Sequence, residues 1–414
     1  MWIIAVHSCI ISGIIFLWYH KTRSSRLACW FLPALSLKIA CGWLIGGLYL
    51  YYYSGGDTWN YFTDGVALAE FARTTSFSNI FSGENTDITD ELIYANQPRA
   101  LLMSRIVGVG CLLTLNNYWL ISTYFSLLSF GGVWFLVQTF NKFFPRTQYA
   151  VGIAWLAYPT FVFWSSGILK ETIAVGLISV LAALTVRFYY RSVDQIALFV
   201  LSWLLTAVLL WLLKYYYAAV LVPLSLAIIL ARLIPHSRFS IVAKTMLLFI
   251  LLTFAATLLH PNLKVDRILN VIVQNHDTFI HISRADAVIS FHHLKPTLTS
   301  FLRNSPLAVF SAWYRPLLFD MNTSLAQIAG LENCLLFVLS MVTLWKVKKT
   351  GISEGDERLW IVVILLYSVL LGGLLAISTP NFGTLIRYKA AFSPFLLYLV
   401  LCPLLLRKSY SLPN

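Results

Sequence analysis

The sequence predicts an all-α, polytopic integral membrane protein with about 11 transmembrane helices. Two observations carry this prediction: 59% of the 414 residues are hydrophobic, and only 11% are charged. Soluble domains average about 45–50% apolar and about 25% charged residues, because most of their surface has to face water. The composition therefore excludes a cytosolic globular enzyme, a disordered chain and a secreted disulfide scaffold.

Eleven segments are long and apolar enough to cross a bilayer, which takes about 20 residues per helix. They are residues 2–19, 27–53, 118–140, 149–165, 168–188, 196–213, 216–233, 242–259, 331–346, 359–378 and 390–406. The segment 100–115 is either a twelfth span or a helix lying at the interface. The first span lacks a basic region before it and a small-residue cleavage site after it, so we interpret it as a retained helix.

Six basic segments set the orientation of these spans. They are residues 20–26, 141–148, 187–191, 232–244, 346–349 and the C-terminal pair Arg407 and Lys408. The positive-inside rule places all six in the cytoplasm, and eleven spans satisfy this with the N-terminus outside and the C-terminus inside. The net charge of +13 then reflects cytoplasmic loops and cations that face anionic lipid, with no nucleic-acid partner.

Two long segments fall on the outer side of a single membrane domain, residues 1–414. The first outer loop, 54–98, holds seven of the 17 acidic residues and one basic residue, Arg73. The second outer segment, 260–330, has an amphipathic pattern around Ile268 and Ile272 that predicts interfacial helices. We expect the chemistry of the protein at the outer face, between these two segments.

The first candidate site is Ser54-Gly55-Gly56-Asp57, where the second predicted span ends. The glycines allow a turn, and Asp57 then opens a predicted helix over residues 58–73. Asp57 and Asp64 are seven residues apart, so they project from the same helix face. Such a carboxylate serves as a general base or a metal ligand; the alternative is an N-cap at Asp57 and a solvated Asp64.

The second candidate site is Phe163-Trp164-Ser165-Ser166-Gly167-Ile168-Leu169-Lys170-Glu171, at the outer end of a predicted helical hairpin. Ions are costly at the start of a spanning helix, which favours a function for Lys170 and Glu171. The alternative is that Lys170 reaches the interface by snorkelling and that Glu171 complements the helix N-terminus.

The third and fourth candidates lie near the C-terminal end of the chain. Arg387 and Lys389 are cations in the last outer turn, against the usual bias, and this is easier to explain if they bind a phosphate; the alternative is snorkelling to the interface. Arg315 and Asp320 close the second outer segment and either bind substrate or only pair with each other. The neighbouring His292 and His293 are poor metal ligands, because adjacent helical side chains point about 100° apart.

Taken together, these motifs resemble those of bacterial membrane proteins that assemble cell-surface polysaccharides. The nearest class is the GT-C-type glycosyltransferases, which use polyprenyl-phosphate-linked sugars, and the polysaccharide polymerases of the EpsG and Wzy kind are similar in general form. The ordered set of motifs spans residues 54 to 395. It consists of Gly-Gly-Asp-x-x-x-Tyr, Phe-Trp-Ser-Ser-Gly-x-x-Lys-Glu, Tyr-Arg-Pro-Leu-Leu-Phe-Asp and Asn-Phe-Gly-Thr-Leu-x-Arg-Tyr.

The resemblance implies a glycosyltransferase that acts at the outer face of a bacterial cytoplasmic (inner) membrane. It moves a sugar from a polyprenyl-phosphate-type lipid to a glycan or lipid-linked acceptor in cell-surface polysaccharide assembly. The implied catalytic residues are Asp57, Asp64 and Glu171. The implied substrate-binding residues are Tyr61, Lys170, Arg315, Asp320, Asn381, Arg387 and Lys389. Many members carry two adjacent acids where this chain has Asp57-Thr58, so a divalent cation, Mg²⁺ or Mn²⁺, stays open as a cofactor and no metal ligand is assigned.

Three alternatives stay open beside this interpretation. The first is a polysaccharide polymerase that joins lipid-linked repeat units by the same chemistry. The second is a transporter or flippase of lipid-linked glycans, which needs charges near the middle of several spans; the interiors of 196–213 and 359–378 carry none. The third is a non-catalytic scaffold of an envelope assembly complex.

Overall fold

The structure is a computed structural model, and it describes residues 2–25, 27–53, 55–81, 91–234, 239–259, 261–284, 287–320, 323–350 and 356–406. Several residues of the predicted loops lie outside these ranges: Arg26, Ser54, Glu84, Asp87, Asp90, Arg238, Arg407 and Lys408. Within the described ranges the regular structure is helical, apart from an isolated bridge between Val288 and Asn381. The all-α prediction is confirmed for this part of the chain.

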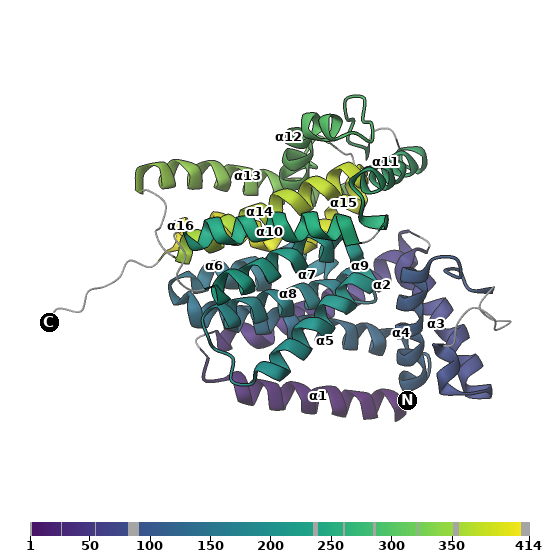
Figure 1. The fold of residues 1–414 in the computed structure, drawn as a ribbon. Helices are drawn as coiled ribbons and strands as arrows, with labels where there is room; N and C mark the ends of the chain where they lie inside the picture. Colours follow the sequence, from purple (N-terminus) through teal and green to yellow (C-terminus); the bar gives the residue numbers. More distant parts are fainter. Residues whose placement is uncertain are drawn as a thin grey trace. The chain divides into compact units, whose positions relative to one another are not determined.

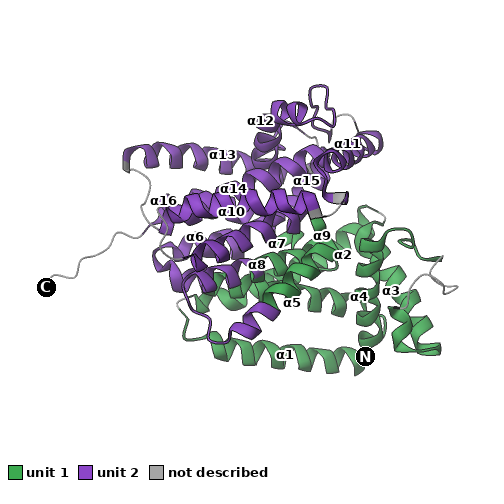
Figure 2. Cartoon of the chain, in the orientation of Figure 1, with its two compact units in different colours: residues 1–138, 162–180, 202–215 green, residues 139–161, 181–201, 216–414 purple. Residues whose placement is uncertain are grey.

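The chain forms two compact units, which Figure 2 shows in different colours. Unit 1 comprises residues 1–138, 162–180 and 202–215, and unit 2 comprises residues 139–161, 181–201 and 216–414. Helices α5 (Tyr118–Phe143), α8 (Lys170–Tyr189) and α9 (Ile196–Leu233) contribute residues to both. A single membrane domain over residues 1–414 stays a prediction.

Unit 1 contains the N-terminal helices (Figure 1). They are α1 (Trp2–Thr22), α2 (Ala28–Tyr51), α3 (Asp57–Thr74), the 3₁₀ turn η1 (Phe77–Ile80) and α4 (Pro98–Thr114). Helix α3 packs closely on α4 at Gly65, which has no side chain. A Cβ atom there would lie only 2.8 Å from the Val107 side chain. The sequence predicts a helix over residues 58–73, and α3 confirms it within one residue at each end.

Unit 2 contains the remaining helices. They are η3 (Pro145–Thr147), α6 (Gln148–Gly152), the π-helix η4 (Ile153–Ala157), α10 (Ile241–Leu259), η5 (Pro261–Leu263), α11 (Val265–Ile282), α12 (Leu298–Tyr314), α13 (Ser324–Thr350), α14 (Asp356–Ser378), α15 (Phe382–Tyr388), η7 (Lys389–Ala391) and α16 (Ser393–Leu405). The short helix α7 (Pro159–Trp164) is divided between the two units. Buried aromatic rings, among them Trp155, Phe395 and Tyr398, form the centre of unit 2.

Eight helices in the described part of the chain are long and apolar enough to cross a membrane: α1, α2, α5, α8, α9, α10, α13 and α14. A ninth is added if residues 382–391 and α16, which are bent by 66° relative to each other, form one span. A polytopic helical protein is therefore supported, whereas the count of eleven and the direction of the termini stay predictions.

The difference from eleven has three causes, and the first of them is the bend before α16, because of which the predicted span 390–406 is not among the eight. The predicted spans 196–213 and 216–233 are the two halves of α9, which are separated by a kink at Lys214, where the backbone is non-helical with φ −144° and ψ 73°; the count of eight takes both halves as one helix. The predicted span 149–165 is divided into α6, η4 and α7, none of which is long enough alone. Pro159 ends the helical run there, because a proline disfavours helical backbone in the residue before it.

The two predicted outer segments contain shorter helices. Residues 54–98 include α3 and η1, and the uncertain stretch 100–115 forms α4, which is not among the eight candidate spans. Residues 260–330 include α11 and α12. These helices agree with the expectation that both segments contain helices rather than extended loops.

Candidate functional site

The Gly-Gly-Asp motif forms the start of α3. Gly55 and Gly56 have φ values of 127° and 132°, a backbone region that favours glycine, and Gly56 is the N-cap. Asp57 follows as the first residue of the helix, where the positive end of the helix dipole stabilises a carboxylate. The N-cap is thus Gly56, not Asp57 as the alternative interpretation of the sequence has it. The Asp57 side chain is half-buried.

Tyr94 connects Asp57 to the rest of unit 1. Its hydroxyl donates a 2.9 Å hydrogen bond to the Asp57 Oδ1 atom. Burial raises the pKa of the Tyr94 phenol, and the neighbouring Asp57 carboxylate raises it further. The phenol therefore keeps its proton and remains a donor to Asp57 at neutral pH.

Asp64 has a different environment from Asp57. Its side chain is 1% exposed, and its two oxygens accept hydrogen bonds from the Ile93 amide (2.8 Å), the Tyr94 amide (3.2 Å) and the Ser104 hydroxyl (3.0 Å). Buried carboxylates with several donors act as anchors, because each donor offsets part of the cost of burial. This geometry favours a positioning role for Asp64, which fixes the backbone of Tyr94, over direct catalysis.

Lys170 begins α8 and reaches the same group of tyrosines. Its Nζ atom lies 5.6 Å from the centre of the Tyr61 ring, and the Tyr61 and Tyr94 ring centres are 4.8 Å apart. Tyr61 is buried, whereas Lys170 is half-buried. Three of the predicted site residues, Asp57, Tyr61 and Lys170, are thus linked through Tyr94.

Glu171 forms a buried ion pair that the sequence does not predict. Its Oε1 atom is 2.8 Å from Nζ of Lys214, and the two side chains are 1% and 3% exposed. Lys214 is the residue at which α9 loses its helical backbone. The next residue, Tyr215, lies under the guanidinium of Arg99, whose Cζ atom is 4.2 Å from the ring centre.

Three sets of contacts in unit 1, Asp57–Tyr94–Tyr61–Lys170, Glu171–Lys214 and Arg99–Tyr215, adjoin one another along the chain at residues 170–171 and 214–215, and together they are called here the Asp57 cluster. Its members are Asp57, Tyr61, Tyr94, Arg99, Lys170, Glu171, Lys214 and Tyr215. The sequence analysis assigns four of them and misses Tyr94, Arg99, Lys214 and Tyr215. One signal was available: Lys214 is the only charged residue between Ile196 and Ala231. A lone charge in so long an apolar run marks a position with a buried partner or a function.

A second group, in unit 2, surrounds Arg315. The Nε and Nη2 atoms of Arg315 donate to the two carboxylate oxygens of Asp320 at 2.9 and 2.7 Å, and the Leu317 amide donates to Oδ2 at 2.6 Å. Burial opposes ionisation of Asp320, but the hydrogen bonds from Arg315 and Leu317 outweigh it and lower the pKa of Asp320. The two residues are paired, as the simpler sequence interpretation expects.

The side chains of Lys389 and Asn381 both form hydrogen bonds within unit 2. Lys389 is 2% exposed and donates to the Arg315 carbonyl and to Asn333 Oδ1. Asn381 caps α15 by accepting a hydrogen bond from the Thr384 amide, and its own amide donates to Ser283 Oγ at 2.8 Å. Both side chains therefore have structural partners, and neither contact argues for or against substrate binding.

Arg387 is half-buried, near the end of α15. Its Cζ atom is 5.3 Å from the centre of the Tyr388 ring. The planar guanidinium presents several N–H donors in a fixed geometry, which suits it for a phosphate group. Its role as a substrate-binding residue stays a prediction.

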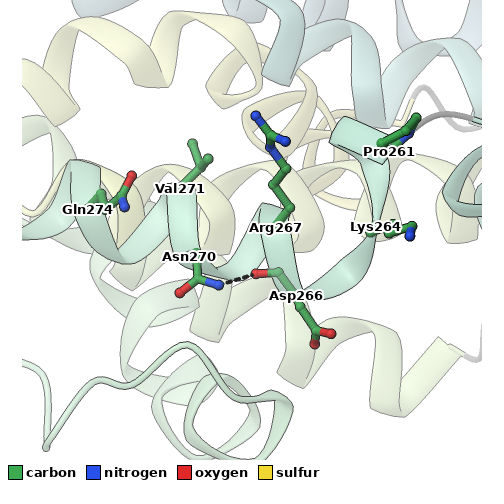
Figure 3. A pocket seen from close by; sticks show the side chains of 7 residues that line it. All are labelled: Pro261, Lys264, Asp266, Arg267, Asn270, Val271 and Gln274. Atoms are coloured by element: carbon green, nitrogen blue, oxygen red, sulfur yellow. Dashed lines mark hydrogen bonds between the residues drawn. The ribbon is translucent and has the colours of Figure 1, made fainter.

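An open hollow of about 540 Å³ lies along the polar side of α11 (Figure 3). It is lined by Pro261, Lys264, Asp266, Arg267, Asn270, Val271 and Gln274. None of the predicted site residues lines it, so it does not mark the candidate site. In the described ranges no group of three His, Cys, Asp or Glu side chains is placed to hold a metal ion.

Comparisons with protein-family models, with curated proteins and with solved structures find no match for this chain. The resemblance to GT-C-type glycosyltransferases stays a prediction. A function therefore has to be inferred from the geometry of the chain's own residues, above all from the Asp57 cluster.

Proposed function

We propose that the protein is an integral membrane glycosyltransferase. In this proposal it transfers a sugar from a polyprenyl-phosphate-type lipid to a glycan or lipid-linked acceptor, at the outer face of a bacterial inner membrane. The observation that carries the proposal is the Asp57 carboxylate, half-buried at a helix start and connected through Tyr94 to Tyr61 and, beyond it, to Lys170.

Asp57 suits the role of general base in this reaction. It is partly accessible, unlike Asp64 and Glu171, whose carboxylates are buried and engaged with donors. Its position in the first turn of α3 and its hydrogen bond from Tyr94 both stabilise the ionised form, which is the form that accepts a proton. We assign supporting roles to the other two acids: Asp64 holds the backbone of Tyr94, and Glu171 pairs with Lys214.

The cations of the Asp57 cluster suit a phosphate leaving group. Lys170 and Arg99 each lie over a tyrosine ring, a contact that orients the charged group. Negative charge develops on the phosphate as it leaves, and preplaced cations lower the energy of that transition state. The tyrosine rings also offer flat apolar faces that suit the apolar faces of a sugar ring.

The proposed reaction is a displacement at the anomeric carbon. An acceptor hydroxyl oxygen forms a bond to that carbon while Asp57 takes the hydroxyl proton. The bond between the anomeric carbon and the phosphate oxygen breaks, and its electron pair leaves with the lipid phosphate. No oxidant or reductant is needed, and a divalent cation that assists the phosphate stays open as a cofactor.

Complementation of a strain that lacks the protein tests the proposal. Asp57→Asn and Lys170→Ala would be compared at matched membrane levels, with surface glycan measured on a gel. Glu70→Gln is the matched control, because Glu70 is an exposed carboxylate on the same helix. Loss of glycan in the first two variants, with unused lipid-linked sugar accumulating, supports the transferase. Wild-type glycan in both variants would overturn the assigned site.

A transporter of lipid-linked glycans is the second candidate, and Lys38 favours it. Lys38 lies near the middle of α2 and is 3% exposed, and its Nζ atom is 2.6 Å from the Ser165 hydroxyl. A cation inside a spanning helix is costly and commonly functional. A transporter would move the intact lipid-linked sugar across the bilayer, whereas the proposed transferase would release the lipid phosphate.

A further inference from the structure

Helices α11 and α12 lie in the same predicted outer segment but expose opposite kinds of surface. Helix α11 buries Leu269 and Ile272, and its exposed residues include the polar Asp266, Arg267 and Gln274 as well as the apolar Ile268 and Val271, which are 37% and 38% exposed. This is the polarity of a helix whose outer side faces water, with the apolar residues turned toward the protein. Helix α11 therefore provides the reference for a water-facing position in unit 2.

Helix α12 has the reverse polarity. Its buried side consists of small or polar residues: Asn304, Ala308, Ser311, Ala312 and Tyr314. Its exposed side carries Leu298, Leu302, Pro306 and Phe310 at intervals of four residues, and Leu307 is exposed next to Pro306. Leu302 is 72% exposed. An apolar outer side over a small-residue inner side is the arrangement of a helix that packs against other helices within lipid.

The contacts of α12 lie along the flank of α14, away from its end. The Trp313 Nε1 atom donates to the Ser368 carbonyl at 3.2 Å, and a Cβ atom at Gly372 would lie 3.1 Å from the Ala312 Cβ. At about 1.5 Å of rise per residue, Ser368 is about 15 Å from the Ser378 end of α14. One half of a bilayer's hydrocarbon core is also about 15 Å thick, so Trp313 lies at membrane depth if α14 crosses the bilayer.

The exposed side of α12 is also continuous with that of α13. Phe310, on the exposed side of α12, contacts the exposed Phe337 of α13, with ring centres 6.2 Å apart. Helix α13 is a candidate span, and it exposes Leu331 and Leu335. The apolar surface of a spanning helix is covered by lipid, and here that surface extends onto α12.

We propose that α12 is embedded in the bilayer and that Leu298, Leu302, Leu307 and Phe310 contact lipid acyl chains. The occupant of this surface is therefore bilayer lipid, and the second outer segment divides into a water-facing helix, α11, and a lipid-facing helix, α12. Arg303, exposed beside Leu302, extends along the helix to place its charged group at the interface. This proposal is independent of any catalytic function.

A photo-crosslinking experiment on the full chain in membranes tests the proposal. The photoreactive amino acid p-benzoylphenylalanine would replace Leu302, and adducts would be identified by mass spectrometry after irradiation. Two controls come from the same unit: position 335 of α13 as the lipid-facing reference and position 267 of α11 as the water-facing reference. Both reference side chains are exposed.

The expected result is that positions 302 and 335 both form lipid adducts and that position 267 forms none. Two results would overturn the proposal. One is absence of lipid adducts at position 302 while position 335 forms them, which would place α12 in water. The other is a crosslink from position 302 to a second copy of the chain or to another protein, which would identify a protein partner as the occupant.

Discussion

The phenol of Tyr94 donates to the carboxylate of Asp57 across 2.9 Å, although the two residues are 37 positions apart in the chain. The amide of the same tyrosine donates to Asp64. Two acids on one face of α3 are therefore bound by the two ends of one residue. The structure gives these acids different environments: Asp64 is buried and holds Tyr94 in place, whereas Asp57 is partly accessible.

The proposed roles of Asp57 as the base and of Tyr94 as its hydrogen-bond donor predict unequal effects of substitution at the two positions. Asp57→Asn removes the proposed general base, a change that costs about 10²–10⁴-fold in rate. Tyr94→Phe removes one hydrogen bond to a carboxylate and should cost about tenfold. Rates of glycan formation in membranes with matched protein levels measure both. An equal loss in the two variants would contradict the assignment of Asp57 as the base.

The ion pair between Glu171 and Lys214 predicts a strong effect on stability. Glu171→Gln leaves the buried Lys214 ammonium without its carboxylate and should cost about 3–5 kcal/mol. The double variant with Lys214→Met removes both charges and should recover part of that loss. Thermal unfolding in detergent compares the stability of the purified wild type, the Glu171→Gln variant and the double variant. A double variant less stable than Glu171→Gln would contradict a role for the pair in neutralising Lys214.

The contact of α5 with α8 in unit 1 predicts that Gly132 tolerates no side chain. A Cβ atom at Gly132 would meet the Gly176 backbone, with the Gly176 carbonyl carbon 2.8 Å away. Gly132→Ala should therefore destabilise the protein by about 1–3 kcal/mol. Gly131→Ala is the matched control, since its Cβ would lie at an ordinary 3.7 Å from Trp18. Equal thermal stability of the two variants would contradict this packing.

The lowered pKa of Asp320 predicts a dependence of stability on pH. Because the folded pKa lies below the unfolded value, the unfolded chain binds the proton first. The contribution of Asp320 is present above the ordinary aspartate pKa of about 3.9 and is lost as pH falls through the lowered folded value. Asp320→Asn should show a smaller loss of thermal stability over this acidic range than the wild type. An identical pH profile for both proteins would disprove the linkage.

Much of the fold follows from local sequence patterns. Long apolar runs predict the spanning helices, and Gly55-Gly56-Asp57 predicts the start of α3, because these signals depend on neighbouring residues only. The two apolar runs on either side of Lys214 predict two helices, and the backbone of α9 is non-helical at Lys214, between them. The ion pair of Lys214 was not predicted, since its partner Glu171 lies 43 positions earlier.

The site was predictable in part for the same reason. Asp57, Tyr61, Lys170 and Glu171 lie in motifs that stand out locally. Tyr94 and Arg99 lie in or next to the segment that folds back onto α3, and their contacts depend on the Asp64 anchor, which no local pattern reveals. The buried state of Asp64 was missed because its donors, the Ile93 and Tyr94 amides, come from a distant part of the chain.

One measurement tests the proposed function most directly. The purified protein would be reconstituted into liposomes with lipid extracted from a strain lacking it, in which unused lipid-linked sugar is expected to accumulate. Release of polyprenyl phosphate and formation of the glycosylated product would be followed for the wild type, Asp57→Asn and Glu70→Gln. The account predicts both products with the wild type and with Glu70→Gln, and a loss of about 10²-fold or more with Asp57→Asn. Movement of intact lipid-linked sugar without release of phosphate, or a wild-type rate in Asp57→Asn, would contradict it.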